Sequence, residues 1–152
     1  SILRTHAKRG RRSSLVVNSR TPVYRRVHSF EGDWHLALEV LASVEPDGHV
    51  PAAHLLSDES GPATRALELT IVTSVVSPKL VERLVLRAYA HHPATVVFVD
   101  PRSFAEGPAA PAHDVTAQLL RLDRAGVAVA VLRRGDDLAE KLSGRRREAA
   151  VV

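Results

Sequence analysis

Polar side chains follow several short apolar runs of the sequence, at the positions where the predicted strands end. These side chains are Asn18, Ser19, Thr73, Ser74, Asp100 and Arg133, with Arg134 directly after the last of them. Ligand and catalytic sites of open α/β sheets form beyond the carboxyl ends of the strands, so we expect this set to share one edge of a sheet. Thr73, Ser74 and Asp100 carry the oxygen atoms that Mg²⁺ prefers as ligands. The set is therefore the candidate site of the sequence.

A structural interpretation of the same residues competes with the chemical one. Ser, Thr and Asp are frequent in turns and helix caps because their side chains hydrogen-bond to nearby backbone groups. Asp100 is the single carboxylate of the set, and no general base accompanies it. We therefore favour polar strand ends and caps, and predict no catalytic residue and no metal ligand. The alternative is a small magnesium-dependent hydrolase or phosphotransfer domain that uses Asp100 with Thr73 or Ser74.

Other enzyme signatures are missing from the sequence. The chain has eight histidines, but no two of them are four residues apart, the spacing that places two ligands on one helix face. Without cysteine there is no thiolate metal site and no cysteine nucleophile. The chain also contains no Gly-x-Ser-x-Gly elbow, no glycine-rich phosphate loop and no Gly-x-Gly-x-x-Gly fingerprint. We expect a protein that is not an enzyme and takes no cofactor.

Positive charge is concentrated near the beginning of the chain. Residues 1–30 hold eight lysines or arginines and no acidic residue, whereas residues 31–144 hold ten basic and sixteen acidic residues. The candidate basic patch is Arg4, Lys8, Arg9, Arg11 and Arg12. Such a patch could contact the phosphates of nucleic acid or of anionic lipids, but it has no interleaved aromatic residues for base stacking. We favour a solvated helix face, and keep nucleic-acid binding as an alternative function.

Alternating strand and helix patterns predict the fold class. Apolar, β-branched runs predict strands over 15–17, 69–72, 95–99 and 127–132, with 23–27 as an edge strand or a loop. Helical spacing occurs from Ile2, after Asp33, after Ser77-Pro78, over about 114–124 and after Asp136 or Asp137. We predict that Asp33, Ser77 and either Asp136 or Asp137 cap their helices. The helix after Asp33 has an apolar stripe that we expect to point inward, formed by Leu36, Val40, Leu41 and Val44. This order predicts an α/β fold in which a three-layer, mostly parallel sheet has helices on both faces. Residues 1–144 form the predicted single domain, and 145–152 a basic flexible tail.

Composition sets the class of protein. A chain of 152 residues with 45% hydrophobic and 25% charged residues is typical of one globular domain. No apolar run reaches the roughly 18 to 20 residues that span a bilayer, so we expect no membrane span in this chain. The sequence has no methionine and begins with Ser1. We therefore expect a fragment of a larger protein.

Six segments, taken in order along the chain, resemble one bacterial family. They are Leu3 to Arg12, Ser14 to Asn18, Gly32 to Gly48, Leu69 to Ser74, Leu122 to Val127 and Arg133 to Leu138. They resemble the carboxyl-terminal part of domain of unknown function 58, whose fold is similar to a von Willebrand factor A domain. In metal-dependent A domains the first strand is followed by Asp-x-Ser-x-Ser, and this chain has no such motif. The resemblance thus implies a von Willebrand A-like sheet that lacks its first strand, and it transfers no metal ligand.

The resemblance also implies a function. Members of that family are membrane-anchored bacterial proteins found alongside MoxR-type AAA+ ATPases. The expected function is a non-enzymatic protein–protein interaction domain that acts with a MoxR-type AAA+ ATPase. The expected location is cytoplasmic, as the cytoplasmic part of a membrane-anchored parent. Since a missing central strand would leave open sheet edges, a homodimer is a further expectation.

Overall fold

The computed structural model describes residues 2–45, 47–58, 61–105 and 115–143. The predicted basic tail, 145–152, lies outside the described residues. The chain forms two compact units, residues 1–66 and residues 67–152, and each is described by itself.

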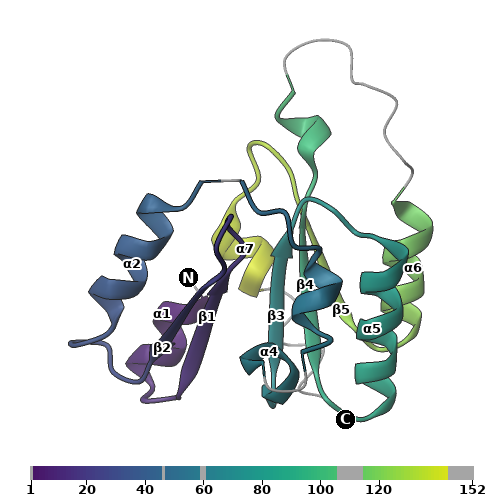
Figure 1. The fold of residues 1–152 in the computed structure, drawn as a ribbon. Helices are drawn as coiled ribbons and strands as arrows, with labels where there is room; N and C mark the ends of the chain where they lie inside the picture. Colours follow the sequence, from purple (N-terminus) through teal and green to yellow (C-terminus); the bar gives the residue numbers. More distant parts are fainter. Residues whose placement is uncertain (1, 46, 59–60, 106–114, 144–152) are drawn as a thin grey trace. The chain divides into compact units, whose positions relative to one another are not determined.

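Unit 1 is built on an antiparallel strand pair. Its elements are α1 (Ile2–Lys8), β1 (Ser13–Val17), β2 (Val23–Val27), α2 (Trp34–Ser43), α3 (Ala52–Leu55) and α4 (Pro62–Arg65) (Figure 1). In the strand pair Ser13 lies opposite Val27, and Val17 lies opposite Val23. The core of the unit consists of Ala7, Val27 and Ala37, with Leu3, Leu15 and Phe30 packed against them. Both α1 and α2 therefore cover the face of the pair that carries Leu15 and Val27.

Unit 2 contains a parallel sheet. Its elements are β3 (Leu69–Thr73), α5 (Pro78–Tyr89), β4 (Ala94–Val99), the 3-10 turn η1 (Pro101–Ser103), α6 (Thr116–Arg124), β5 (Ala128–Leu132) and α7 (Leu138–Ser143). The strand order is β3-β4-β5, and all neighbours are parallel. Figure 1 draws α5 and α6 together on one side of this sheet and α7 on the other. The predicted α/β class is confirmed as a three-stranded parallel sheet flanked by helices.

One expectation about the sheet was wrong. We expected the strand over 15–17 to join the parallel sheet, but among the described residues β1 pairs only with β2, in a sheet of two strands. The connection between these strands is residues 18–22. A parallel crossover needs a dozen residues or more, so this short connection allows only a hairpin. Residues 23–27, for which the sequence allows an edge strand or a loop, are the second strand of that hairpin.

The first helix after the hairpin also differs from its predicted details. Asp33 precedes α2, but its carboxylate caps no backbone N–H of the helix. Its Oδ2 accepts the backbone N–H groups of His28 (2.8 Å) and Ser29 (3.0 Å), and these two hydrogen bonds are the main reason that the pKa of Asp33 lies below its ordinary value. Ala37 is the buried residue of α2, whereas Leu36 and Leu41 are exposed.

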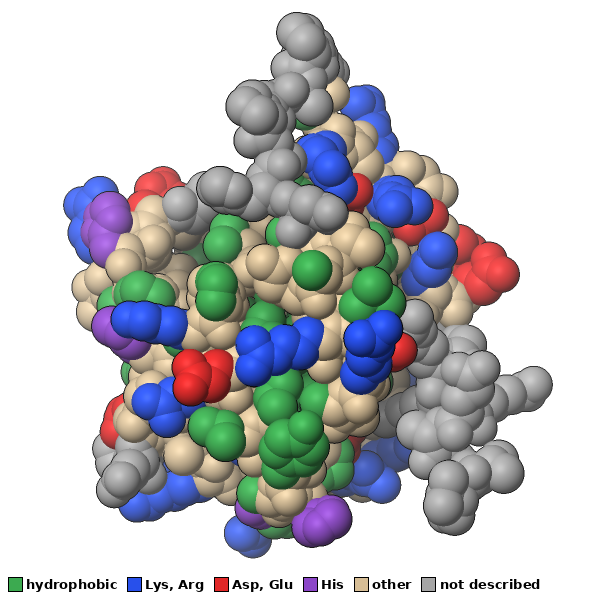
Figure 2. All heavy atoms as spheres, turned by 90° about the vertical axis from the view of Figure 1, so that its right-hand side faces the viewer, with side chains coloured by type: hydrophobic (Ala, Val, Ile, Leu, Met, Phe, Trp, Pro, Cys, Tyr) green, Lys and Arg blue, Asp and Glu red, His purple; other side chains and the backbone are tan. Residues whose placement is uncertain are grey.

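The helices on one side of the parallel sheet carry an apolar outer surface. Leu80, Val81 and Leu84 of α5 and Leu122 of α6 are buried beneath it. Tyr89 and Leu120 face outward and are 69% and 51% exposed. Figure 2 looks onto this side and shows hydrophobic side chains next to Lys and Arg side chains.

Candidate functional site

The five residues of the candidate basic patch have three different surroundings. Lys8 of α1 places its Nζ 5.2 Å from the centre of the Phe30 ring, and the Arg4 guanidinium is 5.9 Å from the same ring. Phe30 in turn stacks on Trp34, with 6.1 Å between ring centres. These two cations therefore take part in packing within unit 1.

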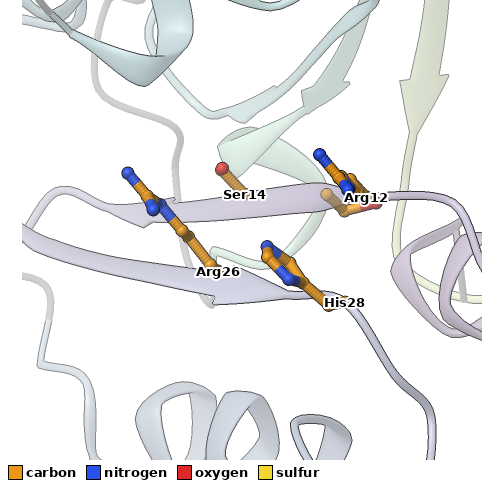
Figure 3. Close-up of a pocket in the computed structure, with 5 residues that line it drawn as sticks. Arg12, Ser14, Arg26 and His28 are labelled. Carbon is orange, nitrogen blue, oxygen red and sulfur yellow. The ribbon is translucent and has the colours of Figure 1, made fainter.

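Arg12 comes directly before β1, the first strand of the hairpin. Arg12 lines a hollow with Ser13, Ser14, Arg26 and His28, and Figure 3 shows Arg12 beside residues of both strands. Arg26 and His28 are separated from Arg12 by more than a dozen residues, so the predicted run did not include them. Arg9 and Arg11 are exposed and line neither this hollow nor the Phe30 ring.

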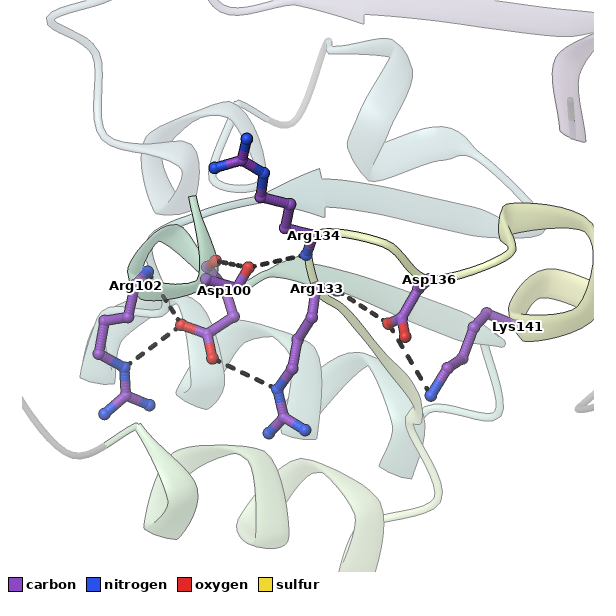
Figure 4. Close-up of polar contacts among 7 residues, drawn as sticks. Asp100, Arg102, Arg133, Arg134, Asp136 and Lys141 are labelled. Carbon is purple, nitrogen blue, oxygen red and sulfur yellow. Dashed lines mark hydrogen bonds and ion pairs between the residues drawn. The ribbon is translucent and has the colours of Figure 1, made fainter. Parts of the chain in front are cut away.

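The predicted strand-end residues belong to the two different units. Thr73 is the last residue of β3, and Ser74, Asp100 and Arg133 each come directly after a parallel strand of unit 2, as predicted. Figure 4 shows Asp100 and Arg133 at that edge. Asn18 and Ser19 lie in the hairpin turn of unit 1, because β1 is not a strand of the parallel sheet.

The side chains of Asn18 and Ser19 form hydrogen bonds that hold the hairpin turn in place. The Asn18 Nδ2 donates a hydrogen bond to the Val50 carbonyl oxygen (2.7 Å), and the Ser19 Oγ donates to the Thr21 carbonyl oxygen (2.8 Å). The neighbouring Arg20 donates its backbone N–H to Asp47 Oδ1 (2.8 Å) and pairs its Nε with Asp47 Oδ2 (3.3 Å). The turn is thus tied to the segment over residues 47–50.

Asp100 is the centre of the polar edge in unit 2. The residue is 6% exposed, and its Oδ1 accepts the backbone N–H (3.1 Å) and the Nε–H (3.3 Å) of Arg102. Its Oδ2 faces the Arg133 Nε at 3.5 Å. Figure 4 shows the two guanidinium groups on either side of the carboxylate. Asp100 therefore caps η1 and joins it to the end of β5.

These contacts determine the charge of Asp100. Burial raises its pKa, but the hydrogen bonds and charge of Arg102, together with Arg133, outweigh burial and hold the pKa below its ordinary value. A carboxylate with a lowered pKa and two guanidinium partners is a poor general base at neutral pH. Its Oδ1 accepts two hydrogen bonds from Arg102, and its Oδ2 forms an ion pair with Arg133.

Thr73 and Ser74 do not complete a site around Asp100. The Thr73 Oγ1 donates to the Val75 carbonyl oxygen (2.9 Å) and accepts the Val75 N–H (3.1 Å), which is a local turn. Ser74 is exposed. Across the described part of the chain, no group of three or more His, Cys, Asp or Glu side chains could hold a metal ion.

The loop after β5 is organised by a second aspartate. The Asp136 Oδ2 accepts the Arg133 backbone N–H (2.9 Å) and lies 3.9 Å from the Lys141 Nζ. Asp137 caps α7 by accepting the N–H groups of Ala139 (2.7 Å) and Glu140 (3.1 Å), so Asp137 is the cap of the two predicted. The turn from β5 to α7 is thus a capped connection.

A surface that the predicted site residues do not include lies between α5 and α6. It is a shallow hollow of about 580 Å³, lined by Val85, Tyr89, Ala117, Leu120, Arg121, Arg124 and Ala125. Tyr89 and Leu120 are exposed although both have large, mainly apolar side chains. The sequence indicates this surface, because Tyr89 and Leu120 are large apolar residues that lie outside the buried stripe of their helices.

Comparisons with family models, with curated proteins and with solved structures found no significant match to the chain. Among the described residues, no helix has the length and apolar character to cross a membrane.

Proposed function

We propose that the chain is a non-enzymatic protein–protein interaction domain and that its docking surface is the hollow between α5 and α6. The observation that carries the proposal is the exposure of Tyr89 and Leu120 beside this hollow. Exposed aromatic and apolar side chains gathered at a concave surface are typical of interaction sites. The pairing of the Asp100 carboxylate with two guanidinium groups favours this function over the magnesium-dependent one.

Charge determines the kind of partner. Arg121 and Arg124 line the hollow, and neither forms an ion pair with an acidic side chain in the residues that the structure describes. A partner that inserts an apolar side chain and presents acidic groups around it would satisfy both the apolar and the basic parts of this surface. Basic residues at the rim would contribute mainly to the association rate and its salt dependence.

The resemblance of the chain to domain of unknown function 58 supports a MoxR-type AAA+ ATPase as this partner. The same resemblance supports a von Willebrand A-like fold, a bacterial source and a cytoplasmic position as part of a membrane-anchored parent. These parts of the proposal rest on the six sequence segments and not on the geometry of the hollow.

The test is binding of the purified chain to the purified MoxR-type ATPase of the same organism. Leu120→Asp should weaken binding at least about tenfold, because it puts an acidic group on the apolar part of the surface. Leu138→Asp is the matched control, since Leu138 is 57% exposed on α7, on the other side of the sheet. Equal loss in both variants, or no binding by the folded wild-type chain, would overturn the proposal.

A further inference from the structure

A basic hollow on the hairpin of unit 1 has no role in the proposed function. It has a volume of about 280 Å³ and is lined by Arg12, Ser13, Ser14, Arg26 and His28. Figure 3 shows the labelled side chains of Arg12, Ser14, Arg26 and His28 projecting from the same side of the two strands. The hollow is thus formed by two segments that are distant in the sequence.

The strand register explains why these side chains meet. Ser14 lies directly opposite Arg26, and Ser13 lies opposite Val27. One step further along the pair, Arg12 is next to His28. Since alternate residues of a strand point to the same face, Arg12, Ser14, Arg26 and His28 share the face opposite to the core residues.

The hollow carries uncompensated positive charge. In the described part of the chain, Arg12 and Arg26 form no ion pair with an acidic side chain. The carboxylate beside His28 is that of Asp33, which accepts the backbone N–H groups of His28 and Ser29. The two guanidinium groups of Arg12 and Arg26 therefore line this hollow without an acidic partner among the described residues.

We propose that this hollow binds a phosphate group, as inorganic phosphate or as the terminal phosphate of a small phosphomonoester. Each guanidinium offers a fork of N–H donors that matches two phosphate oxygens, and the Ser14 hydroxyl adds a further donor. Two guanidinium charges complement a phosphate dianion better than a carboxylate, which carries a single charge. The volume of about 280 Å³ lies just below the range of about 300–1,000 Å³ for ligand sites, so it suits a phosphate group with at most a small substituent.

The experiment is a titration of the ¹⁵N-labelled chain with inorganic phosphate and with phenyl phosphate at constant ionic strength, followed by amide chemical shifts. The expected result is saturable shifts at residues 12–14 and 26–28. Arg12→Gln and Arg26→Gln should each weaken binding at least about tenfold. Arg25→Gln is the matched control, because Arg25 is exposed, neighbours Arg26 and lies on the opposite face of β2. It should leave the affinity unchanged.

The two phosphate probes distinguish the sources of the ligand. Similar affinities would assign the site to the phosphate group itself, and tighter binding of phenyl phosphate would assign it to a phosphomonoester. Absence of saturable shifts, or equal weakening by Arg25→Gln, would overturn the proposal. Tighter binding of a single-stranded oligonucleotide at the same residues would replace it with nucleic-acid binding. None of these outcomes depends on the hollow between α5 and α6.

Discussion

Replacement of Asp100 by Asn separates the charge of this residue from its role as a cap. The Asn side chain keeps an oxygen that accepts the Arg102 backbone N–H, but it loses the ion pairs with Arg102 and Arg133. Those two side chains are 47% and 66% exposed, so water can hydrate them when the carboxylate is removed. No buried charge is left without a partner, and the large penalty for breaking a buried pair does not apply.

The magnitude follows from these contacts. Because the arginine side of each pair is exposed, we use the value for exposed ion pairs, about 0.2–1 kcal/mol each, so Asp100→Asn should lower the free energy of unfolding by about 0.4–2 kcal/mol at pH 7. Asp100→Ala also removes the cap of η1, which contributes about 1 kcal/mol more. The Ala variant should therefore be the less stable of the two, by roughly the value of one cap.

The difference between wild type and Asp100→Asn should depend on pH. Because the pKa of Asp100 is lowered in the folded state, its stabilising contribution is fully present above the ordinary pKa of about 3.9. It is lost as the pH falls through the folded-state pKa. The two proteins should therefore differ most near neutral pH, and converge below about pH 4.

Urea denaturation followed by far-ultraviolet circular dichroism measures these differences. Trp34 is the single tryptophan and lies in unit 1, so its fluorescence reports the unit that does not contain Asp100. Hydrogen exchange of the Arg102 amide gives a local measure: it should accelerate in Asp100→Ala and change little in Asp100→Asn. A loss of about 4 kcal/mol or more in the Asn variant would refute the reasoning on exposed partners. If the difference in free energy of unfolding between wild type and Asp100→Asn grew as the pH falls, the pKa of Asp100 would not be lowered in the folded state, and the reasoning would be refuted.

Two further predictions concern the packing of each unit. Leu122→Ala in unit 2 should lower the free energy of unfolding by about 2–5 kcal/mol, because Leu122 is 0% exposed. Leu120→Ala, at an exposed position of the same helix, should change it by about 0.5 kcal/mol or less, and urea denaturation measures both values. Equal losses would mean that α6 does not pack through Leu122. Gly48→Ala in unit 1 should cost about 1–3 kcal/mol, because a Cβ at Gly48 would overlap the Asn18 carbonyl oxygen. Thermal unfolding followed by Trp34 fluorescence measures this loss, and an unchanged midpoint would contradict the close approach of these two backbone segments.

The strands of unit 2 were predictable because of their composition. The apolar runs over 69–72, 95–99 and 127–132 correspond to β3, β4 and β5 within one residue at each end. A parallel strand covered on both faces has few polar residues, so it gives a nearly continuous apolar run. The cap of α5 was predictable for a local reason, since the Ser77 side chain accepts the Leu80 N–H in the same turn.

The partners of the charged residues were not predictable in the same way. The sequence places Asp100 and Arg133 at one sheet edge, but it does not show that their side chains form an ion pair, because Arg133 reaches Asp100 through the pairing of β4 with β5. The apolar residues of α2 were predicted to point inward, yet Leu36 is 42% exposed. Periodicity indicates which residues share a helix face, but the neighbouring elements decide how much of that face is covered.

The sequence by itself determined the α/β class, the position of the parallel strands and the polar residues at their ends, since these depend on local composition and short-range hydrogen bonding. Only the tertiary structure decided that residues 23–27 are a strand paired with β1, that Arg12 lines one hollow with Arg26 and His28, and that two arginines pair with Asp100. The physical reason is that strand register and helix packing bring together residues that are distant in the chain. Those long-range contacts, and not the residue types alone, distinguish a cap from a catalytic group and a solvated basic run from a binding site.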